Sequence, residues 1–172
     1  EIEKLSAAMP EGETVTLERV SEFAGVRRGE PLPDWVDAVL KRDTVLAISL
    51  LEVVLPQPSV NGVRMATALG AALLGTRLAR SLTDARTRNV TDEIFRLLRE
   101  TRPPGLGDWK VEARRWADAA AGWTGEELDE AIAALYEADR SLKSTTLSDE
   151  RGVLATLLLS IGATRAGAGA AA

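Results

Sequence analysis

Four carboxylates lie within five consecutive residues, at Glu126, Glu127, Asp129 and Glu130. Such a cluster offers the oxygen ligands that hard metal ions prefer, and carboxyl groups that could serve in general acid–base chemistry. A structural role is the simpler interpretation, because acidic side chains in the first turn of a helix interact favourably with the helix dipole. We therefore predict a helix start and no metal site here, and we keep a small helical enzyme using these carboxylates as an alternative.

A capping-box pattern marks the beginning of this helix. In the stretch Thr124-Gly-Glu-Glu127, the Thr124 hydroxyl can accept a hydrogen bond from the backbone N–H of Glu127, and the Glu127 carboxylate can accept one from the N–H of Thr124. If Glu127 only caps the helix, its substitution should cost about 0.5–2 kcal/mol of stability. If it is catalytic, the substitution should abolish an activity.

The chain of 172 residues contains no histidine and no cysteine. This excludes Ser-His and Cys-His nucleophiles, Cys/His zinc sites and disulfides. The sequence also lacks a glycine-rich phosphate loop followed by Lys-Ser or Lys-Thr. We therefore predict no catalytic residue, no cofactor and no metal.

Arginines recur at spacings that place them on shared helix faces. Arg77 and Arg80 form one such pair, and Arg96 and Arg99 form another. A solvated basic face is the simpler interpretation, and phosphate contact by these four residues is the alternative. The formal net charge of −5 gives no overall field that would favour nucleic acid. A helical DNA-binding or regulatory domain is accordingly the second functional hypothesis.

Helical periodicity runs along the chain without convincing strand alternation, so the predicted fold class is all-α, a helical bundle. Thr16, Asp43 and Thr91 are the predicted N-caps. The longest uncharged stretch, 152–164, has 13 residues, whereas a bilayer span needs about 20, so no membrane segment is expected. The sequence starts in helical pattern without methionine, and we expect it to be part of a longer protein. The predicted helices cover residues 1–9, 17–23, 33–41, 44–54, 63–82, 92–99, 108–121, 124–143 and 148–164.

The last two predicted helices form a hydrophobic hairpin. Asp139 and Lys143 are four residues apart with the acid first, which predicts an exposed ion pair worth about 0.3–0.5 kcal/mol. The buried face of the first hairpin helix is predicted to consist of Leu128, Ile132, Leu135, Tyr136 and Leu142. The four tryptophans are predicted to be core or interface anchors: Trp35, Trp109, Trp116 and Trp123.

The hairpin carries a pattern that resembles a known family. Trp-Thr-x-x-Glu-Leu is followed by Leu-x-x-Ala-Asp-x-x-Leu-Lys-Ser and then by a leucine-rich helix, 154–158. This pattern is similar to the C-terminal end of the delta subunit of the bacterial DNA polymerase III clamp loader. Residues 32–51 and 1–26 fit the same family more loosely. The motif positions are Trp123, Thr124, Glu127, Leu128, Asp139, Leu142 and Lys143.

The resemblance implies a domain organisation and a function. Residues 1–30 would be the end of a lid domain and a linker, 31–165 a helical collar domain, and 166–172 a flexible tail. The collar would be a cytoplasmic, non-catalytic module of DNA replication that joins the other clamp-loader subunits. It would contact DNA only indirectly or weakly, with sliding-clamp contact in a missing N-terminal domain. We also expect exposed apolar residues, as collar interfaces require, on the 63–82 helix or on the closing hairpin.

Overall fold

The computed structural model describes residues 31–103, 106–144 and 149–169. The chain divides into two units, Glu1–Glu30 and Pro31–Ala172, and the described residues all belong to the second. The helices predicted within residues 1–23 and the loop at 145–147 lie outside the described residues. The helices are α3 (Pro31–Leu40), α4 (Thr44–Val54), α5 (Gly62–Asp84), α6 (Val90–Thr101), α7 (Trp109–Ala119), α8 (Gly125–Ser144) and α9 (Glu150–Gly169), with a 3₁₀ turn at Ala120–Gly122.

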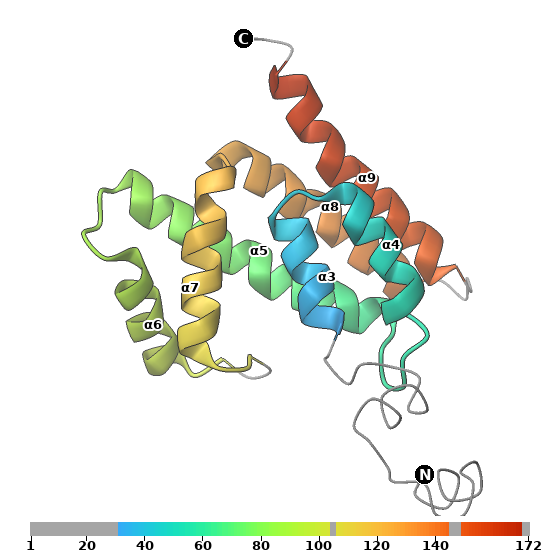
Figure 1. The fold of residues 1–172 in the computed structure, drawn as a ribbon, viewed down its shortest axis with the longest axis horizontal. Coiled ribbons are helices and arrows are strands. Elements are labelled where there is room, and N and C mark those ends of the chain that lie inside the picture. Colours follow the sequence, from blue (N-terminus) through green and yellow to red (C-terminus); the bar gives the residue numbers. More distant parts are fainter. Residues whose placement is uncertain (1–30, 104–105, 145–148, 170–172) are drawn as a thin grey trace, which may run out of the picture. The chain divides into compact units, whose positions relative to one another are not determined.

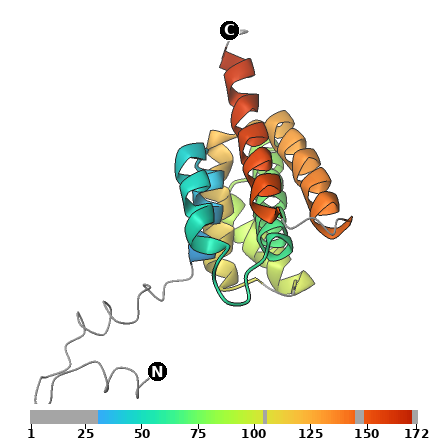
Figure 2. The ribbon, with the colours of Figure 1, turned by 90° about the vertical axis from the view of Figure 1, so that its right-hand side faces the viewer.

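The described part of the chain is all-helical and has no strand, which confirms the predicted fold class. The 23-residue α5 is the central element, and it contacts α3, α6, α7, α8 and α9 (Figure 1). On another side of the bundle, α4, α9 and α8 lie side by side (Figure 2). No helix of the described residues is both long enough and apolar enough to cross a bilayer.

Small residues allow other helices to approach α5 closely. Gly75 lies against the indole of Trp116, and Gly62 lies against Leu142 at the far end of the helix. Thr76 is fully buried and donates its hydroxyl proton to the carbonyl oxygen of Ala72, 2.8 Å away, so its polar group is satisfied within the helix. Nine residues of α5 are buried, so the helix is covered over much of its surface.

Local capping signals set several helix boundaries. Asp43 caps α4, whose bounds are those predicted, because its Oδ1 accepts from the N–H of Leu46 at 2.9 Å. The prediction that Thr91 caps the next helix was wrong: Asn89 caps α6 and accepts from the N–H of Asp92 at 3.2 Å. Asparagine caps as well as threonine does, and Val90 and Thr91 are accommodated in the first turn.

The end of α9 also differs from the prediction. The helix continues to Gly169, past the expected end near residue 164, and so includes 166–169 of the predicted flexible tail. Alanine and arginine, which alternate with the glycines here, are strong helix formers and are compatible with the continued helix. Residues 170–172 lie outside the described residues.

Candidate assembly surface

The capping box at the start of α8 is present as predicted. The N–H of Glu127 donates to Thr124 Oγ1 at 3.1 Å, and the N–H of Thr124 donates to Glu127 Oε2 at 2.8 Å. The other carboxylate oxygen, Oε1, accepts from Arg42 Nη1 at 2.6 Å. Arg42 lies in the connection between α3 and α4, so one carboxylate both caps α8 and ties this connection to it.

Trp123 completes a junction around Arg42. The Arg42 guanidinium stacks over the Trp123 ring at 4.0 Å from its centroid, and the indole N–H donates to the carbonyl oxygen of Leu40 at 2.8 Å. The side chains of Arg42 and Glu127 are only 8% and 13% exposed. We call Leu40, Arg42, Trp123, Thr124 and Glu127 the Arg42 junction. Three family-motif residues therefore have a structural role in this fold, which is to hold the α3–α4 connection against α8.

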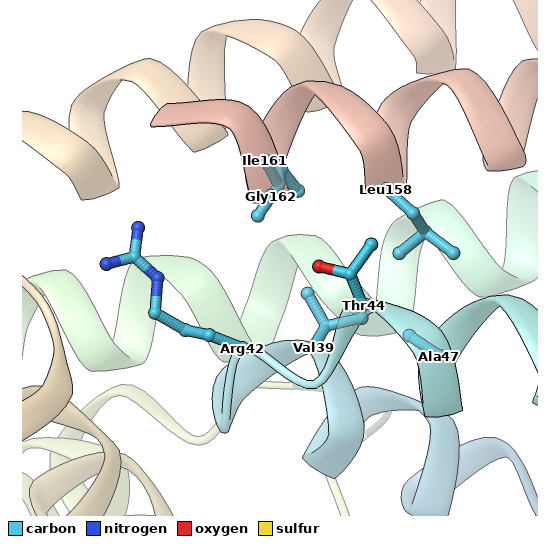
Figure 3. Close-up of a pocket in the computed structure, with 7 residues that line it drawn as sticks. All are labelled: Val39, Arg42, Thr44, Ala47, Leu158, Ile161 and Gly162. Carbon is cyan, nitrogen blue, oxygen red and sulfur yellow. The ribbon is translucent and has the colours of Figure 1, made fainter. Parts of the chain in front are cut away.

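A small pocket beside the junction has no room for a ligand. It measures about 10 Å³ and is bounded by α3, α4 and α9, with the Arg42 guanidinium directed away from Thr44 (Figure 3). A Cβ at Gly162 would lie 2.7 Å from Thr44 Oγ1, so α9 approaches the start of α4 closely. A space of this size holds at most about one water molecule.

Ionisation of Glu127 should make the junction sensitive to acid. Burial raises the pKa of Glu127, but hydrogen bonds from Thr124 and Arg42 and the charge of Arg42 outweigh it and hold the pKa below its ordinary value. A carboxyl group with a lowered folded-state pKa stabilises the fold above its unfolded pKa of about 4.3, and this contribution is lost as pH falls through the folded-state pKa.

We therefore expect Glu127→Gln to lower the free energy of unfolding at pH 7, with a difference from wild type that shrinks steadily below about pH 5. Urea unfolding at several pH values, followed by circular dichroism, measures this difference. A difference that is independent of pH between 3 and 7 would contradict the ionic role of Glu127.

The remaining motif residues lie on the core face or at the other end of α8. Leu128 is fully buried, and Leu142 packs against Gly62 at the start of α5. Lys143 Nζ donates to Asp139 Oδ2 at 2.7 Å, and both side chains are partly exposed, so the predicted surface pair is present. Its exposure limits its contribution to well under 1 kcal/mol.

Tyr136 does not belong to the buried face of α8, contrary to the prediction, because it is 60% exposed. The buried stripe is Leu128, Ala131, Leu135 and Ala138. Alanine is found at both buried and exposed positions. The periodicity of large apolar residues therefore did not show that the face with Ala131 and Ala138 is buried, in place of the face with Tyr136. The prediction for the tryptophans holds: three are buried, and Trp109 packs partly buried against the core.

Three of the four candidate phosphate contacts are paired with carboxylates. Arg77 donates from Nε and Nη2 to Asp129 at 2.8 and 3.1 Å, Arg80 pairs with Asp84, and Arg96 pairs with Glu93 and Glu100. These hydrogen bonds lower the pKa values of Asp129, Asp84 and Glu93. Arg99 lies 6.0 Å from the ring centroid of Phe95. Phosphate contact by these four arginines stays a prediction. The ion pairs do not support it, because they already occupy three of the guanidinium groups.

The carboxylates at 126–130 do not converge on one point. Glu127 faces Arg42, whereas Asp129 faces Arg77 on α5. Among the described residues, no group of three or more acidic side chains is arranged to hold a metal ion. The geometry thus assigns Glu127 to capping and ion pairing, and Asp129 to ion pairing.

The outer side of α4 is the most exposed apolar surface that sequence reasoning missed. Val45 is 82% exposed, Val53 50% and Leu46 44%, and Ser49 lies exposed among them. The opposite side of the helix buries Ala47, Leu51 and Val54. We call Val45, Leu46, Ser49 and Val53 the α4 face. One signal was available in the sequence: Glu52 is the only charged residue of α4, and a helix that is apolar all round is expected to be covered on all sides.

Exposed apolar side chains also occur where the sequence predicted them. Leu74 on α5 is 59% exposed, and so is Leu159 on α9, the helix that lies beside α4 (Figure 2). Large exposed apolar patches typically mark surfaces that bind other proteins. The strongest physical signal for a functional surface in the described residues is therefore the exposed apolar α4 face.

Comparisons with known proteins bear on the fold. No family model matches the sequence, and no curated protein matches it. A solved structure does match: the Bacillus subtilis DNA clamp loader delta protein (YqeN), at 15% sequence identity and a TM-score of 0.62. The fold is clamp-loader-like. The alignment covers 93% of this chain and 44% of that protein, so this chain spans less than half of its length.

Proposed function

We propose that this chain is the collar part of a clamp-loader delta-type subunit, a non-catalytic module that helps to assemble the clamp loader in DNA replication. The observation that carries the proposal is the fold likeness to a clamp loader delta protein over 93% of the chain. In this proposal, residues 31–165 form the collar domain, 1–30 end the preceding lid domain, and the partners are other clamp-loader subunits. Contact with DNA is indirect or weak, in keeping with the net charge of −5.

The α4 face is the surface we propose for one of these contacts. Fully burying a valine or leucine side chain is worth about 1.5–3 kcal/mol, so covering Val45, Leu46 and Val53 would contribute on the order of 3–5 kcal/mol. The Arg42 junction fixes the connection from which α4 starts, and Gly162 seats α9 against the same end of α4. A rigidly held apolar helix face suits assembly, because little conformational entropy is lost when it is covered.

The proposal is tested by mixing the purified chain with the other clamp-loader subunits of its source organism. We expect a joint peak in size-exclusion chromatography and a larger species in analytical ultracentrifugation at micromolar concentration. Absence of any association at tens of micromolar would overturn the proposed function.

The role of the α4 face is tested by Val45→Asp/Val53→Asp. Because both side chains are largely exposed, we expect the melting temperature to change by no more than a few degrees, while the affinity for the partner subunits falls at least tenfold. Thr101→Asp/Ala121→Asp adds the same charge at exposed positions of α6 and of the 3₁₀ turn, outside α4, α5 and the closing hairpin, and is the matched control. Equal loss of affinity in both variants would contradict the assignment of the contact to α4.

A further inference from the structure

A groove separates α3 from α7 on one side of α5. Both helices pack against α5, and they stand next to each other (Figure 1), with Arg115 of α7 paired to Asp37 of α3. The groove has a volume of about 570 Å³ and is open to solvent. Its lining comes from Asp37 and Leu40 in the last half of α3, from Lys41 just after that helix, and from one face of α7: Val111, Arg114, Arg115, Asp118 and Ala119.

The interior of the groove is apolar and held at a fixed width. Leu40 is buried, Val111 is 55% exposed, and Ala119 leaves room beside them. Arg115 links the two walls, because its Nε lies 2.9 Å from Asp37 Oδ1 while its Nη1 lies 3.0 Å from Glu112 Oε1. Because Asp37 and Glu112 already neutralise the Arg115 guanidinium, we do not expect it to bind an anionic ligand.

The charged residues at the rim of the groove differ from Arg115, because they are exposed and not ion-paired within the described part of the chain. Lys41, Arg114 and Asp118 are exposed, and none of their side chains forms an ion pair with another residue in the described ranges. By contrast, Arg77, Arg80 and Arg96 are each held by a carboxylate of their own unit. The groove therefore presents two available cations against one available anion, beside an apolar interior, in a chain of net charge −5.

The apolar interior and the cationic rim together indicate which kind of ligand the groove would bind. An apolar side chain would cover Val111, and carboxylates next to it would meet Lys41 and Arg114, as charge complementarity requires. An open groove between two helices suits a peptide segment better than an enclosed small molecule, because an anchor side chain can enter while the peptide backbone stays outside.

We propose that the α3–α7 groove binds an acidic peptide segment of a partner protein, with one leucine-sized side chain seated against Leu40, Val111 and Ala119. Carboxylates flanking that side chain pair with Lys41 and Arg114. The groove uses none of the residues of the α4 face, so this binding is a second activity that stands whether or not the chain assembles through α4.

Selection of peptides on the immobilised chain tests the proposal. A phage-displayed library of random dodecapeptides is the probe, and the enriched peptides are then synthesised with a fluorescein label for anisotropy titrations. We expect the enriched peptides to share an apolar residue flanked by Asp or Glu, and their affinity to fall as salt is raised from 50 to 300 mM.

Variants locate the binding. We expect Lys41→Glu/Arg114→Glu to weaken the selected peptide at least tenfold and Val111→Ser to weaken it several-fold, with unchanged circular dichroism spectra. Arg99→Glu/Arg102→Glu makes the same change in charge at exposed positions of α6 and just beyond it, and should leave the affinity within twofold. No enrichment, enriched peptides without acidic residues, or equal weakening by the control would each overturn the proposal.

Discussion

Replacing Gly75 with alanine is expected to destabilise the bundle by about 3 kcal/mol. A Cβ at this position would lie 2.1 Å from Cδ2 of Trp116 and 2.3 Å from Cε3, distances that no real contact tolerates. Gly75 is in the middle of α5, and Trp116 is 4% exposed, so neither the backbone nor the ring can move without separating α5 from α7. Overpacking of a core costs about 1–3 kcal/mol and occasionally more.

Urea unfolding followed by circular dichroism measures this loss, and Gly70→Ala is the matched control. A Cβ at Gly70 would meet only Leu135 Cδ2, at an ordinary contact distance of 3.4 Å. Alanine is favoured over glycine inside a helix by about 0.5–1 kcal/mol, so the control should be neutral or stabilising. Wild-type stability in Gly75→Ala would mean that α7 does not pack on α5 at this residue.

A double variant separates the clash from other effects of the substitution. Trp116→Leu removes the ring and by itself leaves a cavity, with a typical cost of a few kcal/mol. If the clash with Trp116 causes the loss, Gly75→Ala/Trp116→Leu should be more stable than the sum of the two single losses predicts.

Arg42→Ala should also cost about 3 kcal/mol of stability. The substitution leaves Glu127 without its cation at a site where its side chain is 13% exposed, and it uncovers the face of Trp123. Removing one partner of a buried ion pair costs about 3–5 kcal/mol, because the remaining charge is uncompensated. Glu127 keeps its hydrogen bond from the Thr124 N–H, which places the expected loss at the lower end.

Arg77→Ala is the matched control for this pair. Arg77 also binds a carboxylate through two nitrogens, but its side chain and that of Asp129 are 35% and 58% exposed. Exposed pairs contribute about 0–1 kcal/mol, so the loss should be below about 1 kcal/mol. Arg42→Lys should recover only part of the stability, because an ammonium group lacks the planar fork that pairs and stacks at once. Equal losses in Arg42→Ala and Arg77→Ala would contradict a buried Arg42 junction.

The two ends of α8 illustrate how far the sequence predicts this site. At the N-terminal end, the hydrogen bonds between Thr124 and Glu127 follow from their spacing, and at the other end the Asp139–Lys143 pair does so too. The second partner of Glu127 does not follow, because Arg42 is 85 residues away along the chain. The candidate surface was only partly predictable: exposed residues on α5 and α9 were expected, whereas the α4 face was not.

By itself, the sequence determined the helical class, the starts of the described helices to within two residues, and the surface pairs one turn apart. These features depend on hydrogen bonds and side-chain contacts within a few residues, which the local order of residues specifies. Only the tertiary structure decided that Arg42 stacks on Trp123, that Tyr136 faces outward and that α4 leaves an apolar side uncovered. The physical reason is that apolar helices such as α4 offer several faces for burial, and packing against distant helices selects which face is covered.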